Sequence, residues 1–270
     1  MKLTYLGTAA AEGFPAVFCR CPYCIEARRL GGKNIRTRSQ ALLNSDLLID
    51  LPADTYYHFL QNGIEGDTVK YLLITHGHSD HFYPNELFLR HPPYAHGMAV
   101  PTLRVIGPRG ALASMESTPQ NVEVTPISAY ETVTLGEYRV TALPARHMRE
   151  EDGALIYVIE GDKTLLYAHD TGILFDEVFS YIEEKKWVFD MVSLDCTLVD
   201  NPSHAHARHM GFAGVGEVLR RLADIGAVTK ETVRYVNHFS HNGNPLQEPL
   251  EKRAAAYGCL VSYDGCSVEF

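Results

Sequence analysis

The seven residues Thr75–His81 read THGHSDH and place three histidines and one aspartate within six consecutive positions. They follow the apolar run Tyr71–Ile74, which predicts a buried strand that ends where the histidines begin. Side chains two positions apart on a strand point the same way, so His76 and His78 share one side. The turn that follows can bring the last aspartate and histidine to a second position nearby. Imidazole and carboxylate are usual ligands of divalent transition metals, so this segment predicts a contribution to two adjacent ions.

Three further candidate ligands each lie shortly after a predicted strand, at His147, Asp170 and His238. Strand ends that gather on one rim of a sheet are where such side chains can meet. We therefore expect these residues to join the histidine segment in one site. The alternative is a solvated, histidine-rich surface segment. That alternative does not explain why ligand-type residues recur after separate strands.

A second cluster of ligand-type residues lies near the N-terminus, where residues 19–24 read CRCPYC. The thiolates of Cys19, Cys21 and Cys24 can occupy three corners of a tetrahedral structural zinc site. His241, in the segment HFSH, can complete that site. A disulfide between the first two thiols is geometrically poor. The remaining alternative is three free thiols in a loop.

The chain has 270 residues and a formal net charge of −9 at pH 7. This length suits one large domain or two small ones. No linker-like break interrupts the sequence, so we expect one domain over residues 1–270. The acidic balance disfavours non-specific nucleic-acid binding, which normally needs a basic face. No apolar run of about 18 residues predicts a membrane span, and the N-terminus does not resemble a signal peptide. We therefore expect a cytoplasmic protein with no membrane partner.

The predicted elements change in order along the chain, because strands dominate at first and then alternate with helices. Helices are expected over residues 54–61, 173–185, 211–226 and 246–257, and the cysteine cluster is expected on a loop. Residues 82–101, which are rich in proline and aromatic residues, are expected to form an ordered loop with at most one helical turn. Two sheets covered by outer helices would satisfy this order.

These features resemble the metallo-β-lactamase fold superfamily over most of the chain. The opening LTYLGTAAAEG, the H-x-H-x-D-H turn and the three later ligands follow the order of that superfamily. The resemblance implies an α/β fold, a four-layer αββα sandwich of two mixed sheets flanked by helices, with a two-metal cleft at one edge. It also implies the ligands of the two ions: His76, His78 and His147 for one, Asp80, His81 and His238 for the other, with Asp170 bridging them.

The aspartate at the bridging position distinguishes subgroups of the superfamily. Phosphodiesterase-like members have an aspartate at this position and so resemble this chain, where the residue is Asp170. Lactamases often have a cysteine nearby. Aspartate together with five histidines favours harder ions. The resemblance therefore implies two divalent ions in the active site, either manganese or zinc, besides one structural zinc ion at the cysteine cluster.

The cysteine cluster narrows the resemblance to PhnP-like enzymes, the phosphoribosyl cyclic phosphodiesterase type of metal-dependent hydrolase. That group combines C-x-C-x-x-C with a histidine three residues after the last metal ligand, which is His241 here. It also has a D-C-S/T segment, matched at Asp195–Thr197. The segment GTAAAEGFP resembles a pyrroloquinoline-quinone biosynthesis protein too, which leaves a non-catalytic binding protein as an alternative. The intact H-x-H-x-D-H turn favours the hydrolase.

The resemblance implies a phosphodiesterase that hydrolyses a small cyclic or nucleotide-like phosphodiester through a metal-bound hydroxide. Asp80 would orient that hydroxide, and His209 would protonate the departing alkoxide. The same cleft suits a lactone, ester or thioester hydrolase. An RNA-processing nuclease usually needs a protruding basic arm, which is not evident here, so no stable nucleic-acid partner is expected. Family members often form homodimers.

Several other polar or aromatic residues near the predicted site are weaker candidates. His204 and His206 are more typical of a solvated loop. The loop of residues 82–98 either covers the cleft or packs on the core. Arginine suits phosphate, but each of the nearby arginines taken alone is more typical of a surface: Arg146, Arg149 and Arg208.

Overall fold

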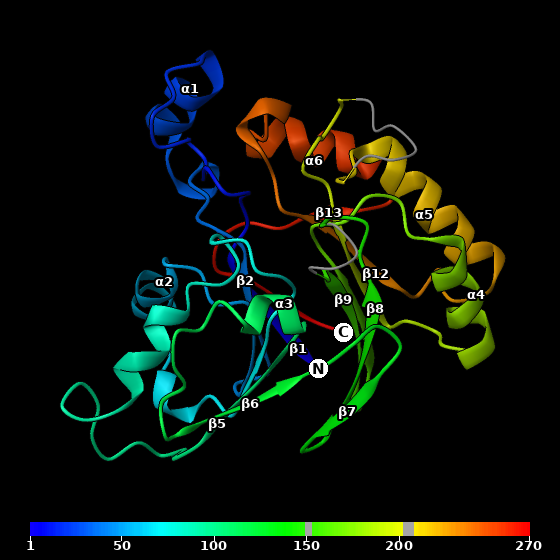
Figure 1. Ribbon diagram of the computed structural model, residues 1–270. Helices are drawn as coiled ribbons and strands as arrows, with labels where there is room; N and C mark the ends of the chain where they lie inside the picture. The colour runs from blue at the N-terminus through cyan, green and yellow to red at the C-terminus, as the bar shows by residue number, and fades with distance from the viewer. Residues whose placement is uncertain (149–152, 202–207) are drawn as a thin grey trace.

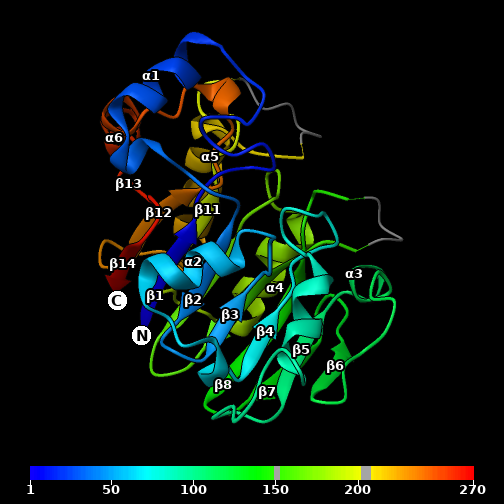
Figure 2. The ribbon, with the colours of Figure 1, turned by 90° about the vertical axis from the view of Figure 1, so that its left-hand side faces the viewer.

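The computed structural model describes residues 1–148, 153–201 and 208–270 and contains two seven-stranded β-sheets (Figure 1). The sheets pack face to face, and helices cover their outer faces. Figure 2 shows the first sheet from outside, with α2 (Thr55–Asn62) lying across it. This arrangement confirms the four-layer αββα sandwich expected from the sequence.

The first sheet joins both ends of the chain and is mixed. Its N-terminal part is antiparallel and the part from β3 to β6 is parallel. The strand order is β14 (Cys266–Glu269), β1 (Lys2–Gly7), β2 (Gln40–Leu43), β3 (Leu47–Ile49), β4 (Tyr71–Leu73), β5 (Leu103–Gly107) and β6 (Val122–Pro126).

The second sheet is also mixed, with a parallel half from β10 to β13 and an antiparallel half from β7 to β10. Since β8 and β10 both run antiparallel to β9, they end at the same edge. The strand order is β13 (Leu260–Val261), β12 (Val233–Asn237), β11 (Met191–Asp195), β10 (Thr164–Ala168), β9 (Leu155–Glu160), β8 (Tyr138–Pro144) and β7 (Thr132–Leu135).

Each face of each sheet is closed by apolar packing. On the second sheet, three helices form the outer layer, two at the right of Figure 1 and α6 at its top: α4 (Asp176–Lys185), α5 (Phe212–Asp224) and α6 (Gln247–Ala255). On the first sheet, α2 and α3 (Arg109–Leu112) form that layer. A third cluster fills the space between the sheets and contains the buried rings of Tyr5, Tyr157 and Tyr167. No helix within the described ranges is long and apolar enough to cross a membrane.

The cysteine segment begins a helix, although the sequence suggested a loop. Helix α1 (Pro22–Leu30) has Cys21 as its N-cap, whose Sγ accepts a hydrogen bond from the backbone N–H of Cys24 at 3.4 Å. Proline at the first helical position suits a helix start, because its missing N–H would be unpaired there anyway. The helix is short and polar, which hid it from periodicity.

Other differences are local. Edge strand β7 was not anticipated, because its alternation covers only four residues. Helix α4 begins three residues later than expected from residue 173, because Asp170 has a φ of 50° and the backbone that follows it is tied to the loop at Arg146.

The loop of residues 82–98 packs on the outer face of the first sheet, so the core-packing alternative is the correct one. Phe82 and Leu87 are buried in the cluster beneath α2. The loop contains a seven-residue 3₁₀-helix, η3 (Pro84–Arg90), longer than the single turn expected. Tyr94 is 66% exposed.

A buried hydrogen-bond network fixes the backbone immediately after β3. Asp50 has a φ of 65°, in the left-handed region that non-glycine residues seldom adopt. Its carbonyl accepts a hydrogen bond from Nε2 of Gln40 at 3.0 Å, and the same Nε2 donates to Thr55. Nδ1 of His58 donates to the amide oxygen of Gln40 at 2.6 Å. Burial lowers the pKa of His58 to about 4, so this imidazole is neutral.

Replacing Gln40 by methionine tests the network. Gln40→Met keeps a similar volume but leaves the Asp50 carbonyl and His58 Nδ1 buried without partners. We expect the free energy of unfolding to fall by roughly 2–4 kcal/mol, measured by urea denaturation followed by circular dichroism. Gln61→Met, on the exposed side of α2, should change it by less than about 0.5 kcal/mol. Equal effects of the two substitutions would contradict this role for Gln40.

Candidate metal centre

Three imidazoles converge beyond the ends of β4 and β8. Nε2 of His76 and Nε2 of His147 each lie 3.0 Å from Nδ1 of His78. His76 and His147 are buried, whereas His78 is exposed. Two nitrogens bound to one tetrahedral zinc ion lie about 3.3 Å apart. The spacing of these nitrogens therefore fits a shared ion.

A second set of ligand-type side chains lies next to the first. Its members are all buried, and their ligand atoms lie within 4.8 Å of one another. Nε2 of His81 is 3.2 Å from Nε2 of His238 and 3.5 Å from Oδ2 of Asp80. The fourth member is Asp170, which follows β10. The sequence-predicted ligands thus come together from four separate segments; their role as ligands stays a prediction.

The carboxylate of Asp170 lies between the two sets. Its Oδ2 is 2.7 Å from Nε2 of His81 and 3.3 Å from Nε2 of His76, which belong to different sets. Nε2 of His147 is 3.9 Å from the same oxygen. This central position is the one a bridging ligand requires.

The other oxygen of Asp170 provides a direct test of whether the site suits metal ions. Oδ1 is 3.2 Å from Nδ1 of both His209 and His238. Neither pair has hydrogen-bond geometry, so within the described part of the chain this oxygen is buried without a partner. An unpartnered buried carboxylate oxygen is costly. A divalent cation would remove that cost, and the donor set of imidazoles and carboxylates suits one.

Two of the candidate ligands have strained backbones. Asp170 has a φ of 50° and His238 a φ of 65°, both in the left-handed region. Such conformations in non-glycine residues cluster at functional sites, because the surrounding structure must hold them. In both residues the chain turns sharply off the end of a strand, which directs the side chain towards the centre of the site.

Asp50 orients the first-sheet part of the site. Its Oδ1 accepts a hydrogen bond from the backbone N–H of Thr75 at 2.8 Å, and its Oδ2 is 2.7 Å from Nδ1 of His81. The carboxylate thereby fixes the imidazole so that Nε2 faces the site, as carboxylates commonly do for metal-binding histidines. Sequence reasoning did not identify Asp50, although an aspartate ending the apolar run LLID was the available signal.

Asp195 has the equivalent position in the second sheet. It accepts hydrogen bonds from the backbone N–H of Met210 at 2.8 Å and from Oγ1 of Thr197 at 3.0 Å, and it lies 3.1 Å from Nδ1 of His209. Oγ1 of Thr197 is also 2.8 Å from Nδ1 of His238. The sequence showed this segment only as part of a motif, and its supporting role became visible in the fold.

Burial and neighbouring charges set the protonation of the centre. Burial, followed by the nearby His81, holds the pKa of His76 well below its ordinary value. Burial also lowers the pKa of His147. At His81 burial acts in the same direction, but the carboxylates of Asp170 and Asp50 prevail and raise its pKa well above the ordinary range. At Asp170 burial is outweighed by His238 and His81, and its pKa lies well below normal.

His209 lies beside the centre, next to both Asp170 and Asp195, with 27% of its side chain exposed. Burial acts to lower its pKa, but the two carboxylates raise it to about 10. The family resemblance implies a proton donor at this position, and in this environment the imidazole is protonated near neutral pH.

The cysteine cluster and His241 also meet as predicted. The ligand atoms of these four residues lie within 4.8 Å of one another: Cys19, Cys21, Cys24 and His241. Nδ1 of His241 is 3.6 Å from Sγ of Cys24 and 3.8 Å from Sγ of Cys21. Sulfur and nitrogen ligands on one tetrahedral zinc ion lie about 3.6 Å apart. The geometry therefore fits a closed site that joins α1 to η4 (His241–Gly243), just beyond β12.

The thiols of this cluster differ in acidity. Burial opposes ionisation of Cys21, but hydrogen bonds from His241 and from the backbone N–H of Cys24 lower its pKa to about 6. Burial raises the pKa of Cys24 to about 12. A cation would be needed to keep all the thiols ionised together, since ligating cysteines bind as thiolates.

The remaining candidates have structural contacts or lie outside the described residues. Arg146 donates from Nε to the carbonyl of Ile173 at 2.9 Å, and the carbonyl of Arg208 is 3.3 Å from Nδ1 of His147. Arg149, His204 and His206 fall in the ranges that are not described.

Several solved structures have the same architecture. A diphosphatase from the PhnP family has a TM-score of 0.75 at 20% identity, covering 100% of this chain and 96% of that one. Zn(2+)-bound PqqB from Methylobacterium extorquens has a TM-score of 0.76 at 21% identity, with both chains fully covered. The short form of human tRNase Z has a TM-score of 0.63 at 15% identity, covering 100% and 99%. These similarities establish the fold.

Comparison of the sequence with family models assigns the chain to a family. A search of curated proteins found no match to this chain. The family model described as the beta-lactamase superfamily domain matches residues 52–233, which include most of the predicted ligands of the dinuclear centre. The chain therefore belongs to the beta-lactamase superfamily.

Proposed function

We propose that this protein is a metal-dependent phosphodiesterase acting on a small cyclic or nucleotide-like phosphodiester. The observation that carries this proposal is the buried carboxylate of Asp170, shared between two adjacent sets of ligand-type side chains. The similarity to a PhnP-family diphosphatase supports phosphorus as the site of attack. The aspartate at position 170, where lactamases often have a cysteine nearby, also supports phosphorus as the site of attack.

The proposal assigns each side chain of the centre to an ion. His76, His78 and His147 would hold one ion, Asp80, His81 and His238 the other, with Asp170 between them. When bound, two divalent ions supply a hydroxide nucleophile at neutral pH and polarise a phosphoryl oxygen. The mixture of imidazole and carboxylate donors suits manganese or zinc.

Two side chains would handle protons and orientation. Asp80, with a buried carboxylate beside His81, can accept a hydrogen bond from the attacking water and fix its direction. His209 is partly exposed, and its pKa is raised to about 10, so its imidazole is protonated near neutral pH. It can donate a proton to the departing oxygen, while Asp195 holds its ring.

Replacing Asp80 tests the centre. Asp80→Asn should lower the content of bound divalent ions and reduce turnover of bis(p-nitrophenyl) phosphate by more than about 100-fold, since even supporting residues of metal sites cost about 10–100-fold. Plasma mass spectrometry and the release of p-nitrophenolate measure the two effects. Asp162→Asn, at an exposed carboxylate far from the site, is the matched control.

A lactone assayed in parallel distinguishes the alternatives. Turnover of the lactone without turnover of the diester would favour carboxylic ester chemistry in the same cleft. Metal-loaded protein that turns over neither substrate would favour a binding or carrier role. The structural similarity to Zn(2+)-bound PqqB gives that role its specific support.

The leaving group tests His209. A nucleoside 2′,3′-cyclic phosphate expels a basic alkoxide that needs a proton, whereas methyl p-nitrophenyl phosphate expels a stable phenolate. We expect His209→Gln to lower kcat about 100-fold or more on the cyclic substrate but less than about 10-fold on the aryl substrate. His96→Gln, on an exposed loop, should change neither. Equal losses on the two substrates would exclude His209 as the proton donor.

The cysteine cluster is proposed as a structural zinc site. Cys21→Ser should remove about one zinc ion per chain and lower the Tm, because metal binding at a closed site contributes folding free energy. Native mass spectrometry and differential scanning calorimetry measure these changes. Cys266→Ser, at a buried thiol in the core between the sheets, should retain all bound zinc. Unchanged zinc content in Cys21→Ser would refute the site.

A further inference from the structure

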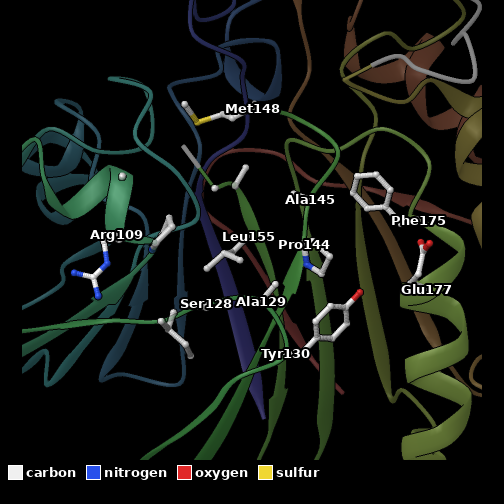
Figure 3. A pocket seen from close by; sticks show the side chains of 15 residues that line it. Arg109, Ser128, Ala129, Tyr130, Pro144, Ala145, Met148, Leu155, Phe175 and Glu177 are labelled. Atoms are coloured by element: carbon white, nitrogen blue, oxygen red, sulfur yellow. The ribbon is translucent and has the colours of Figure 1, made fainter. Parts of the chain in front are cut away.

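A groove of about 540 Å³ lies between α3 and the start of α4 (Figure 3). Its floor is formed where β8 ends and β9 begins, at Pro144, Ala145 and Leu155. Small-molecule sites usually have volumes of about 300–1,000 Å³, so the groove can hold a ligand of that kind. Its lining belongs to the described residues.

Two walls of the groove belong to segments that carry proposed metal ligands. Met148, at the upper end in Figure 3, directly follows His147. Phe175, on the opposite wall, ends the loop that begins at Asp170. The guanidinium of Arg146 stacks on the Phe175 ring at 4.2 Å and ties these two walls together.

The third wall, α3, packs directly on the histidine turn. A Cβ added at Gly77 would lie 3.2 Å from the Cα of Ala111, tighter than most real contacts. Gly77 separates His76 from His78, so α3 contacts the turn that carries two members of the first ligand set. Each wall of the groove therefore belongs to, or contacts, a segment that carries proposed ligands.

The lining of the groove favours a flat ring. Aliphatic side chains form the floor, and the rings of Tyr130 and Phe175 border it. Charged groups occur at opposite sides, with Arg109 on α3 and Glu177 on α4. A sugar would need more hydrogen-bond partners than this floor offers. A base can stack on aromatic rings and donate its edge N–H groups to a carboxylate.

The backbone at Tyr130 is held in an unfavourable conformation that keeps its ring at the groove. Tyr130 has a φ of 69°, uncommon for a bulky residue. Its N–H donates to the carbonyl of Ala142 at 2.7 Å, and its ring packs edge-on against Tyr181, with centroids 4.8 Å apart. Strain of this kind concentrates at ligand-binding positions.

From this geometry we infer that the groove binds the nucleobase of the substrate while the phosphate occupies the metal centre. The inference rests on the proposed phosphodiesterase function for the position of the phosphate. It makes Tyr130 and Phe175 the residues that select a nucleotide over a simple sugar phosphate.

Equilibrium binding tests this without turnover. Manganese-loaded full-length protein is titrated calorimetrically with adenosine 5′-monophosphate and with ribose 5-phosphate, which share the phosphate but differ in the base. We expect the nucleotide to bind about 10-fold or more tightly, the size of one base stacked on an aromatic ring. Tyr130→Gly should remove most of this difference. Glycine accepts the positive φ, so the variant should keep its fold.

Two further variants sharpen the result. Ser128→Trp, at the exposed rim of the groove, should obstruct binding of the base. It should therefore also reduce the difference in affinity between the nucleotide and ribose 5-phosphate. Tyr94→Gly, at an exposed tyrosine of another loop, should retain it. The inference would be overturned if the unmodified protein bound the two ligands with equal affinity. It would also be overturned if neither Tyr130→Gly nor Ser128→Trp changed the preference for the nucleotide.

The outcomes also separate this inference from the proposed function. A Tyr130-dependent preference for the nucleotide in a protein without diesterase activity would retain the groove and reject the phosphodiesterase. If the protein hydrolyses the diester but shows no preference for a base, the proposed function stands and base binding in the groove is rejected.

Discussion

The arrangement of the candidate metal centre depends on the buried carboxylate of Asp170. The carboxylate of Asp170 lies among imidazoles from four segments, and one of its oxygens has no hydrogen-bond partner among the described residues. A charge removed from water needs compensating positive charge, and imidazoles alone supply it only when they are protonated. Cations are the alternative, and the spacing of the surrounding nitrogens suits them.

Each sheet supplies its own orienting carboxylate. Asp50 follows β3 and holds His81, while Asp195 ends β11 and holds His209 and, through Thr197, His238. Both sit at strand ends on the edge where the ligands gather. The layer of ligands is thus supported from either side by acidic residues that do not face its centre, an arrangement that fixes which ring nitrogen points inward.

The convergence of the candidate ligands could be predicted from sequence much further than the residues that support them. His76, His78 and the later candidates are recognisable because each follows an apolar run, and strand ends bring distant residues together. The role of Gln40 could not be predicted, because it depends on the left-handed backbone at Asp50 that only the fold reveals. Helix α1 was missed because it is short and polar, and because a thiol rather than an oxygen caps it. The groove beside α3 depends on contacts between segments far apart in the chain.

The division of ligands between the sheets has a further consequence. The turn after β4 belongs to the first sheet, whereas His147, Asp170 and His238 belong to the second, so each assigned ion would take ligands from both layers. Loading would then act as a cross-link through the middle of the sandwich. Ions that bind only the folded chain shift the folding equilibrium by mass action. In a cell short of these ions, empty molecules would open more often and be degraded first, so the abundance of the protein would follow metal supply without any dedicated sensor.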